Sequence, residues 1–138
     1  MKIIATSHGK LCDGLIDSYK MIVGEAAEII TLPFLGSLTD FRKQQKEIFE
    51  TYKGEKLLVL CDLLGGTPYN EFLRAKIEGQ FVGEIICGFN LGMLIELSLA
   101  LTADEPRLDD MIDLALNAGK SSIRLAECEE GSCDEIDF

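Results

Sequence analysis

The order of apolar and polar positions along the chain predicts strands that are separated by helices. Short apolar runs predict strands, and they lie at 2–7, 27–34, 56–62, 81–90 and 121–127. Between the first two runs, apolar residues at 11, 15, 19 and 22 recur at the spacing of one helical face. This first helix is expected to end near Gly24, and Pro33 is expected to stop the second strand.

Helices are also predicted after the second, third and fourth strands. Ser37 or Thr39 is the expected cap of the helix that follows the second strand. Segment 91–102 is apolar nearly all round, which indicates a helix that is buried on more than one side. Segment 107–119 is amphipathic and is expected to end at its terminal glycine, Gly119.

Strands that alternate with helices predict an α/β fold, here a three-layer sandwich around a mostly parallel open sheet. The expected strand order is 2-1-3-4, with the short run 121–127 as an additional edge strand. The run 56–62 is continuously apolar, as expected when helices cover both faces of a sheet. One domain is therefore predicted over residues 1–127, followed by an acidic, mobile tail at 128–138.

Composition narrows the partners and the compartment. The chain has 138 residues and a formal net charge of −11, which argues against nucleic acid or an anionic membrane as its main partner. No apolar run reaches the length of about 18 residues that predicts a membrane span, and the first strand is too short for a signal peptide. The five cysteines are odd in number and form no CxxC pair, which indicates reduced thiols in a cytoplasmic protein.

The only histidine of the chain, His8, follows the first strand. Ligands of open α/β sheets bind beyond the carboxyl ends of the strands, where the loops after His8, Asp62 and Asn90 meet. In the order 2-1-3-4 the first and third strands are neighbours, so His8 and Asp62 are expected side by side. We expect the Asp62 carboxylate to accept the Nδ1–H of His8, which leaves Nε2 as the nucleophile.

The loop after the third strand favours an anion. Thr67 is expected to cap the following helix with Pro68 at its first position, so the helix N-terminus directs N–H donors toward His8. Gly65 and Gly66 allow the backbone to approach closely. Phosphoryl transfer suits this set, because an imidazole both accepts and releases the group and the remaining task is positioning and charge stabilisation. Neither a cofactor nor a metal is expected.

Plainer interpretations stay open for each motif. A histidine after a strand is often a loop residue, the GGTP segment is often only a turn and a cap, and Asp62 is able to cap a turn. Cys12 lies within one helical turn of His8 and suggests a Cys–His nucleophile pair, although packing is the more usual role. Cys128 and Cys133 together would make only a weak metal site.

Three segments resemble the mannose-family IIA component of the bacterial phosphoenolpyruvate-dependent sugar phosphotransferase system (PTS). They are IIATSHGKLCDGLIDSYKMIVG, LLVLCDLLGGTPYN and GFNLGMLIEL, in that order along the chain. The resemblance implies that His8 carries the phosphoryl group on Nε2 and that Asp62 orients it and stabilises its charge. It also implies that Thr67, Gly65, Gly66 and Ser7 bind the phosphate, with Ser7 where the family often has threonine.

The resemblance further implies partners and a role in sugar uptake. HPr, the histidine phosphocarrier protein, would donate the phosphoryl group, and a IIB component would receive it. The family commonly forms homodimers that exchange a C-terminal strand, and its members are cytoplasmic and reach the membrane only through the transporter. The chain ends at Phe138 without an Ala/Pro-rich linker, so IIB is expected to be a separate chain. The sugar itself stays open.

Two alternatives of other classes remain at this point. The first is a regulatory or sensor IIA-like module, for example the phosphoryl-donor subunit of a dihydroxyacetone kinase. The second is a flavodoxin-like cofactor-binding protein, which predicts a Ser/Thr-rich phosphate loop after the first strand. TSHGK is a poor version of such a loop.

Overall fold

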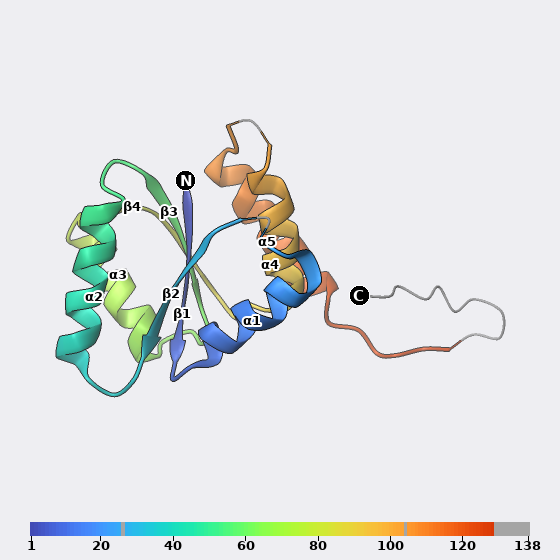
Figure 1. The fold of residues 1–138 in the computed structure, drawn as a ribbon, viewed down its shortest axis with the longest axis horizontal. Coiled ribbons are helices and arrows are strands. Elements are labelled where there is room, and N and C mark those ends of the chain that lie inside the picture. The colour runs from blue at the N-terminus through green and yellow to red at the C-terminus, as the bar shows by residue number, and fades with distance from the viewer. Residues whose placement is uncertain (26, 104, 129–138) are drawn as a thin grey trace.

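A parallel sheet of four strands forms the middle layer of the protein (Figure 1). The computed structural model describes residues 1–25, 27–103 and 105–128. The strands lie in the order β2-β1-β3-β4, which confirms the predicted topology. Their bounds are Lys2–His8 for β1, Ile29–Phe34 for β2, Lys56–Cys61 for β3 and Val82–Cys87 for β4.

Helices cover both faces of the sheet (Figure 1). One layer contains α2 and α3, and the other contains α1, α4 and α5. This arrangement confirms the three-layer α/β sandwich. The bounds are Leu11–Val23 for α1, Leu38–Thr51 for α2, Thr67–Ile77 for α3, Leu91–Leu101 for α4 and Leu108–Ser121 for α5.

Successive residues of the two central strands supply two separate cores. In β1, Ile3 and Ala5 pack under α1, α4 and α5, whereas Ile4 packs under α2 and α3. β3 alternates in the same way, and Leu58 and Val59 are both fully buried on opposite faces. Burial on both faces explains why these strands are continuously apolar in the sequence.

The outer strands are shorter than the sequence predicts. β2 begins at Ile29, and it continues through Pro33, which pairs in register with Ser7. Proline is tolerated there because β2 is an edge strand, and the strand ends one residue later, at the predicted position 34. β4 ends at Cys87, and the N–H groups of Gly88 and Phe89 then both donate to the carbonyl of Cys61, at 2.9 and 3.3 Å.

Helix ends follow local chemistry. Ser37 is the cap of α2, since its hydroxyl accepts the N–H of Asp40 at 3.2 Å. Gly119 does not end α5, because the helix continues to Ser121. A side chain at Gly119 would lie 2.8 Å from Cε of Met93, so this glycine permits α5 to pack closely on α4.

The strand expected at 121–127 is not formed. Ser121 closes α5, and residues 123–128 have no regular secondary structure and lead away from the layers (Figure 1). Ile123 and Leu125 are 80% and 83% exposed, and among the described residues no strand lies beside this segment to pair with it. Cys133 and the rest of the acidic tail from 129 onward lie outside the described residues.

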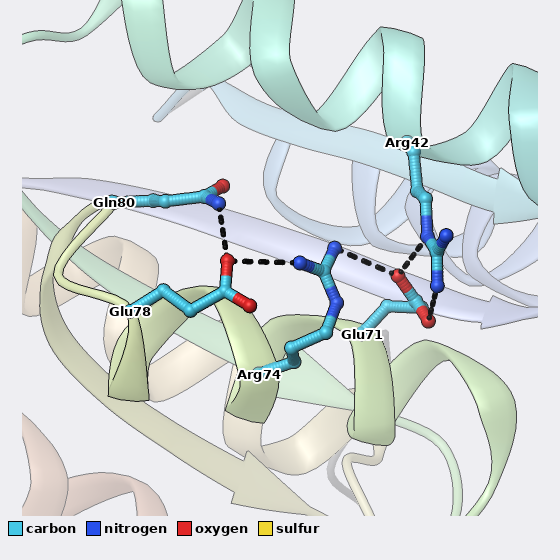
Figure 2. A network of polar contacts seen from close by, with 5 residues as sticks. All are labelled: Arg42, Glu71, Arg74, Glu78 and Gln80. Carbon is cyan, nitrogen blue, oxygen red and sulfur yellow. Dashed lines mark hydrogen bonds and ion pairs between the residues drawn. The ribbon is translucent and has the colours of Figure 1, made fainter.

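A chain of charged side chains joins α2 to α3 (Figure 2). Arg42 donates to both carboxylate oxygens of Glu71, at 2.8 and 3.0 Å, and Arg74 donates to Oε2 at 3.1 Å. Arg74 also reaches Glu78 at 3.0 Å, and Gln80 donates to the same carboxylate. The hydrogen bonds of Arg42, partly opposed by burial and aided by Arg74, lower the pKa of Glu71.

Glu71→Gln is expected to lower the free energy of unfolding by about 1–3 kcal/mol at neutral pH, because the arginines lose a buried charged acceptor. Since folding lowers the pKa of Glu71, its contribution is complete above the ordinary value of 4.5 and disappears as the pH falls through the folded pKa. Urea unfolding of the unaltered protein and of Glu71→Gln, from neutral to acidic pH, measures the difference in their free energies of unfolding, which should become smaller as the pH falls. Glu78→Gln is the control, because that carboxylate is 48% exposed and should contribute little.

Candidate functional site

His8 and Asp62 meet at the carboxyl edge of the two central strands. His8 is the last residue of β1, and Asp62 directly follows β3. Oδ2 of Asp62 lies 2.9 Å from Nδ1 of His8 and also accepts the backbone N–H of His8 at 2.9 Å. Oδ1 accepts the N–H of Leu63 at 2.9 Å. The side-by-side position that the strand order predicts is therefore present.

The surroundings of Asp62 favour its charged form. Its side chain is only 11% exposed, and this burial by itself would raise the pKa of the carboxyl group. The backbone and ring hydrogen bonds from His8, the charge of the imidazole and the N–H of Leu63 together outweigh burial. The pKa of Asp62 therefore lies below its ordinary value, and the carboxylate is ionised at neutral pH.

An ionised carboxylate also selects one form of the neutral imidazole. Because Asp62 is able only to accept a hydrogen bond, Nδ1 of His8 carries the ring proton in this contact. The lone pair of a neutral ring is then on Nε2. The His8 side chain is 45% exposed, so the site combines a largely buried carboxylate with an accessible imidazole.

Gly66 lies directly against the imidazole. A Cβ atom built on Gly66 would stand 3.1 Å from Nε2 of His8 and closer still to Cε1. Real Cβ atoms essentially never approach another atom as closely as this one would approach Cε1, so with any larger residue the ring or the start of α3 must move. The second glycine of the GGTP segment is thus required for the position of His8.

The cap of α3 differs from the prediction. Gly66, with an extended backbone, is the N-cap, and its carbonyl accepts the N–H of Asn70 at 2.9 Å. Thr67 is therefore the first helical residue, because the turn at Gly66 already accepts the first bond of the helix. Its N–H belongs to the first turn, whose donors have no partner within the helix.

Asn70 is a site residue that the sequence reasoning missed. Its side-chain amide donates to the carbonyl of Gly65 at 3.0 Å and so fixes the loop that presses Gly66 against His8. A signal was available, because Asn70 lies one helical turn after the glycine pair and carries a side chain able to bond to the loop behind it.

Ser7 and Cys12 form the turn beneath the site and do not line it. Ser7 is fully buried, and its hydroxyl accepts the N–H of Cys12 at 2.9 Å and donates to the carbonyl of Gly9 at 3.0 Å. In the described structure both bonds of the Ser7 hydroxyl support the turn after β1. Burial raises the pKa of the Cys12 thiol, which argues against an activated Cys–His pair.

The loop after β4 is also structural. Oδ1 of Asn90 accepts the N–H of Met93 at 3.0 Å and caps α4, while its amide donates to the carbonyl of Gly119 at 2.9 Å. Among the described residues, no group of three or more His, Cys, Asp or Glu side chains is placed to hold a metal ion. Within the same residues, no helix is both long enough and apolar enough to cross a bilayer.

Comparison with known proteins identifies relatives that cover most of the chain. A family model described as "PTS system fructose IIA component" matches residues 2–116. The chain is 31% identical to the PTS system fructose-specific EIIA component of Bacillus subtilis, over 70% of this chain and 68% of that protein. It is 26% identical to the PTS system sorbose-specific EIIA component of Lacticaseibacillus casei, over the whole of both chains.

Solved structures of similar proteins have the same fold. The mannose/sorbose specific IIA subunit of the phosphotransferase system from Enterococcus faecalis has a TM-score of 0.80 at 28% identity, over 95% of this chain and 98% of that one. The phosphotransferase system component EIIA from Streptococcus agalactiae has a TM-score of 0.78 at 32% identity, over 89% and 95%.

These matches assign a family in place of the flavodoxin-like cofactor-binding alternative. The match extends from β1 into α5, so it includes both strand ends that carry His8 and Asp62. This protein therefore belongs to the family of PTS system fructose IIA components, phosphotransferases that carry phosphoryl groups in sugar uptake and work with other components of that system.

Proposed function

We propose that Nε2 of His8 accepts a phosphoryl group from phospho-HPr and passes it to a separate IIB component. The 2.9 Å contact between Asp62 and Nδ1 carries this proposal. It keeps the proton on Nδ1 and directs the Nε2 lone pair to the phosphorus atom. As the N–P bond forms, the bond from phosphorus to the HPr ring breaks, and the positive charge that develops on the His8 ring is compensated by the Asp62 carboxylate.

The start of α3 is the proposed cradle for the phosphoryl oxygens. The N–H groups of Thr67 and Tyr69, which belong to the first helical turn, and the positive end of the helix dipole favour an anion beside Nε2. Gly66 brings this turn against the ring, and Thr67 contributes its hydroxyl and N–H. Gly65 contributes indirectly, because its carbonyl accepts the Asn70 amide and so fixes the loop. Ser7 also contributes indirectly, because its hydroxyl supports the turn after β1.

Exposed leucines give partner proteins a surface to bind. The leucine rim consists of side chains that follow the carboxyl ends of β1, β2 and β3, namely Leu11, Leu35, Leu38, Leu63 and Leu64. Their exposed fractions range from 37% for Leu38 to 71% for Leu64. Because the rim occupies the same edge of the sheet as His8, a partner that buries it would bring its phosphoryl group to Nε2.

Incubation of the purified protein with phospho-HPr tests the donor step. We expect one phosphoryl group per chain, in a bond that acid hydrolyses, followed by rapid transfer to a cognate IIB protein. Phosphorylation without transfer to any IIB protein would instead indicate the regulatory module, such as a dihydroxyacetone kinase donor. No phosphorylation at all would contradict the proposal.

The wider setting follows from the relatives. Their names refer to fructose and sorbose, so we place this chain in a system for a hexose of that kind, with the sugar selected by the other components. The chain would act in the cytoplasm as one domain over residues 1–127 and would be peripheral to the membrane through its transporter.

Asp62→Asn is expected to slow the transfer by about one to two orders of magnitude, because a charge-assisted hydrogen bond contributes about 1.5–3 kcal/mol. The amide keeps the shape of the side chain but removes the charge and is also able to donate to the ring, which favours the unreactive tautomer. Rapid-quench measurement of the rate gives the effect. Thr67→Val is the comparison, since loss of one hydroxyl should slow transfer less. Full activity of Asp62→Asn would show that the arrangement is wrong.

A second copy of the chain is the proposed occupant of the apolar groove on the opposite helical layer. The groove of about 900 Å³ lies between α1, α4 and α5, with Leu91, Ile95 and Leu114 among its lining residues. Leu99, on α4, is 52% exposed, although the sequence predicts a helix buried on more than one side. Pairing would cover this surface and give the segment 123–128 a neighbour.

Sedimentation at micromolar concentration is expected to give a dimer rather than a monomer of 15.2 kDa. Ile95→Glu places a charge in the groove and should shift the equilibrium toward the monomer. Ile77→Glu is the control, because Ile77 is 77% exposed and lies on α3 in the other layer. A monomer of the unaltered protein at this concentration would contradict the proposal.

A further inference from the structure

We propose that Phe34 is a positioning residue for His8, which holds the imidazole in the orientation that keeps Nδ1 on Asp62. Only the expected change in the rate of phosphoryl transfer rests on the proposed function of His8. The orientation itself is a property of the free protein and is measured separately.

Phe34 and His8 are partners across the sheet. Their Cα atoms pair in register between β1 and β2, and both are the last residues of their strands. In register-paired positions the two side chains point to the same face of the sheet, here the face under α2 and α3. Their rings meet edge to face, with centroids 6.3 Å apart and planes at 86°.

Phe34 is itself held by the core. Its ring packs edge to face on Phe41 at 5.9 Å, and Phe41 packs in the same way on Phe72 at 6.1 Å. Phe41 and Phe72 are 2% and 0% exposed. The carbonyl of Phe34 also accepts the N–H of Gly9, the residue after His8, at 2.8 Å. Phe34 is therefore held in place by the core and in turn limits the position of the exposed His8 ring.

Three contacts then define the orientation of the imidazole. Asp62 binds Nδ1, Gly66 stands against the edge that carries Cε1 and Nε2, and the Phe34 ring lies at right angles to the imidazole plane. The hydrogen bond to Asp62 tolerates some rotation of the ring about the Cβ–Cγ bond. Phe34 restricts that rotation, so its removal should release Nδ1 from Asp62 for part of the time.

The tautomer of His8 is the direct readout. Because the chain has a single histidine, a long-range ¹H–¹⁵N correlation spectrum of the labelled full chain contains one imidazole. We expect the Nδ1–H form in the unaltered protein and a mixture of both tautomers in Phe34→Leu. Transfer from phospho-HPr should slow by about threefold to tenfold in Phe34→Leu, the range set by an edge-to-face aromatic pair. Phe34→Tyr keeps the ring and should retain both the tautomer and the rate.

Phe49→Leu is the matched control. Phe49 is half-buried like Phe34 and packs edge to face on a core ring, Phe72, at 6.0 Å, but it has no contact with His8 among the ring contacts of the described residues. This variant should lose comparable stability and leave the His8 tautomer unchanged. If both leucine variants change the tautomer equally, general loosening of the core explains the effect and the proposal is overturned.

Two further outcomes would also overturn the proposal. One is a Phe34→Leu protein with the tautomer and transfer rate of the unaltered protein. The other is the absence of a nuclear Overhauser contact between the His8 and Phe34 rings in the unaltered protein, which needs no variant. Phe34→Met is the replacement if the leucine variant does not fold. A tautomer change together with an unaltered protein that phospho-HPr fails to label would contradict only the proposed function.

Discussion

Replacing His8 by alanine is expected to abolish labelling by phospho-HPr. The chain has no second histidine that would take over, and the neighbouring thiol, Cys12, is fully buried with a raised pKa. Ser7 and Thr67 have hydroxyls, but an unactivated hydroxyl is a weak nucleophile at neutral pH. Mass spectrometry of the intact protein measures the result, and the fold of the variant is checked by its unfolding transition.

The chemistry of the label provides an independent check in the unaltered protein. A phosphoryl group on an imidazole nitrogen is hydrolysed in acid, whereas a phosphate ester of serine or threonine survives. Nitrogen and phosphorus NMR distinguish the two ring isomers, and the contact between Asp62 and Nδ1 predicts the Nε2 isomer. Label that survives acid, label that persists in His8→Ala, or label on Nδ1 would each contradict this account of the site.

Gly66→Ala is expected to slow transfer by about two orders of magnitude, because misplacement of a reacting group by 1 Å is able to cost about that much. The new methyl group would lie 3.1 Å from Nε2 and closer to Cε1, so the imidazole or the start of α3 must move. Either shift separates the nucleophile from the helix N-terminus or from Asp62. The backbone of Gly66 is compatible with alanine, since its φ is −75°, so the effect should fall on rate far more than on stability.

Gly14→Ala is the matched control for that substitution. Gly14 lies within α1, and a Cβ atom there would meet nothing within 4 Å. Alanine is the better helix former by about 0.5–1 kcal/mol, so this variant should be slightly more stable and transfer at the normal rate. If Gly66→Ala also transfers at the normal rate, the close packing of ring and glycine has no functional importance.

Much of the site could be predicted because it depends on topology. Parallel strands place their carboxyl ends at one edge, and the order 2-1-3-4 makes β1 and β3 neighbours, so His8 and Asp62 had to lie together. The continuous apolar run of β3 indicated burial on both faces. These conclusions need only the order of elements and the periodicity of the side chains.

The remainder depends on contacts between segments that are distant in sequence. Gly119 looked like a helix end, but its meaning comes from Met93, which packs against it from α4. Thr67 looked like a cap because its hydroxyl suits that role, whereas the turn at Gly66 had already taken the position. The strand expected at 121–127 has the right composition, yet a strand forms only where another backbone is present to pair with it.

One oxygen atom, Oδ2 of Asp62, accepts hydrogen bonds from both the backbone N–H and the ring Nδ1–H of the same residue, His8. The two hydrogen bonds therefore depend on the position of β3 along β1 as well as on the rotation of the imidazole. A slip of either strand by one residue would reverse the faces of its side chains and break both bonds together. The rate of phosphoryl transfer by this protein should therefore depend on the alignment of β1 and β3. Core substitutions that shift the strands would lower this rate before they change the folded fraction of the protein.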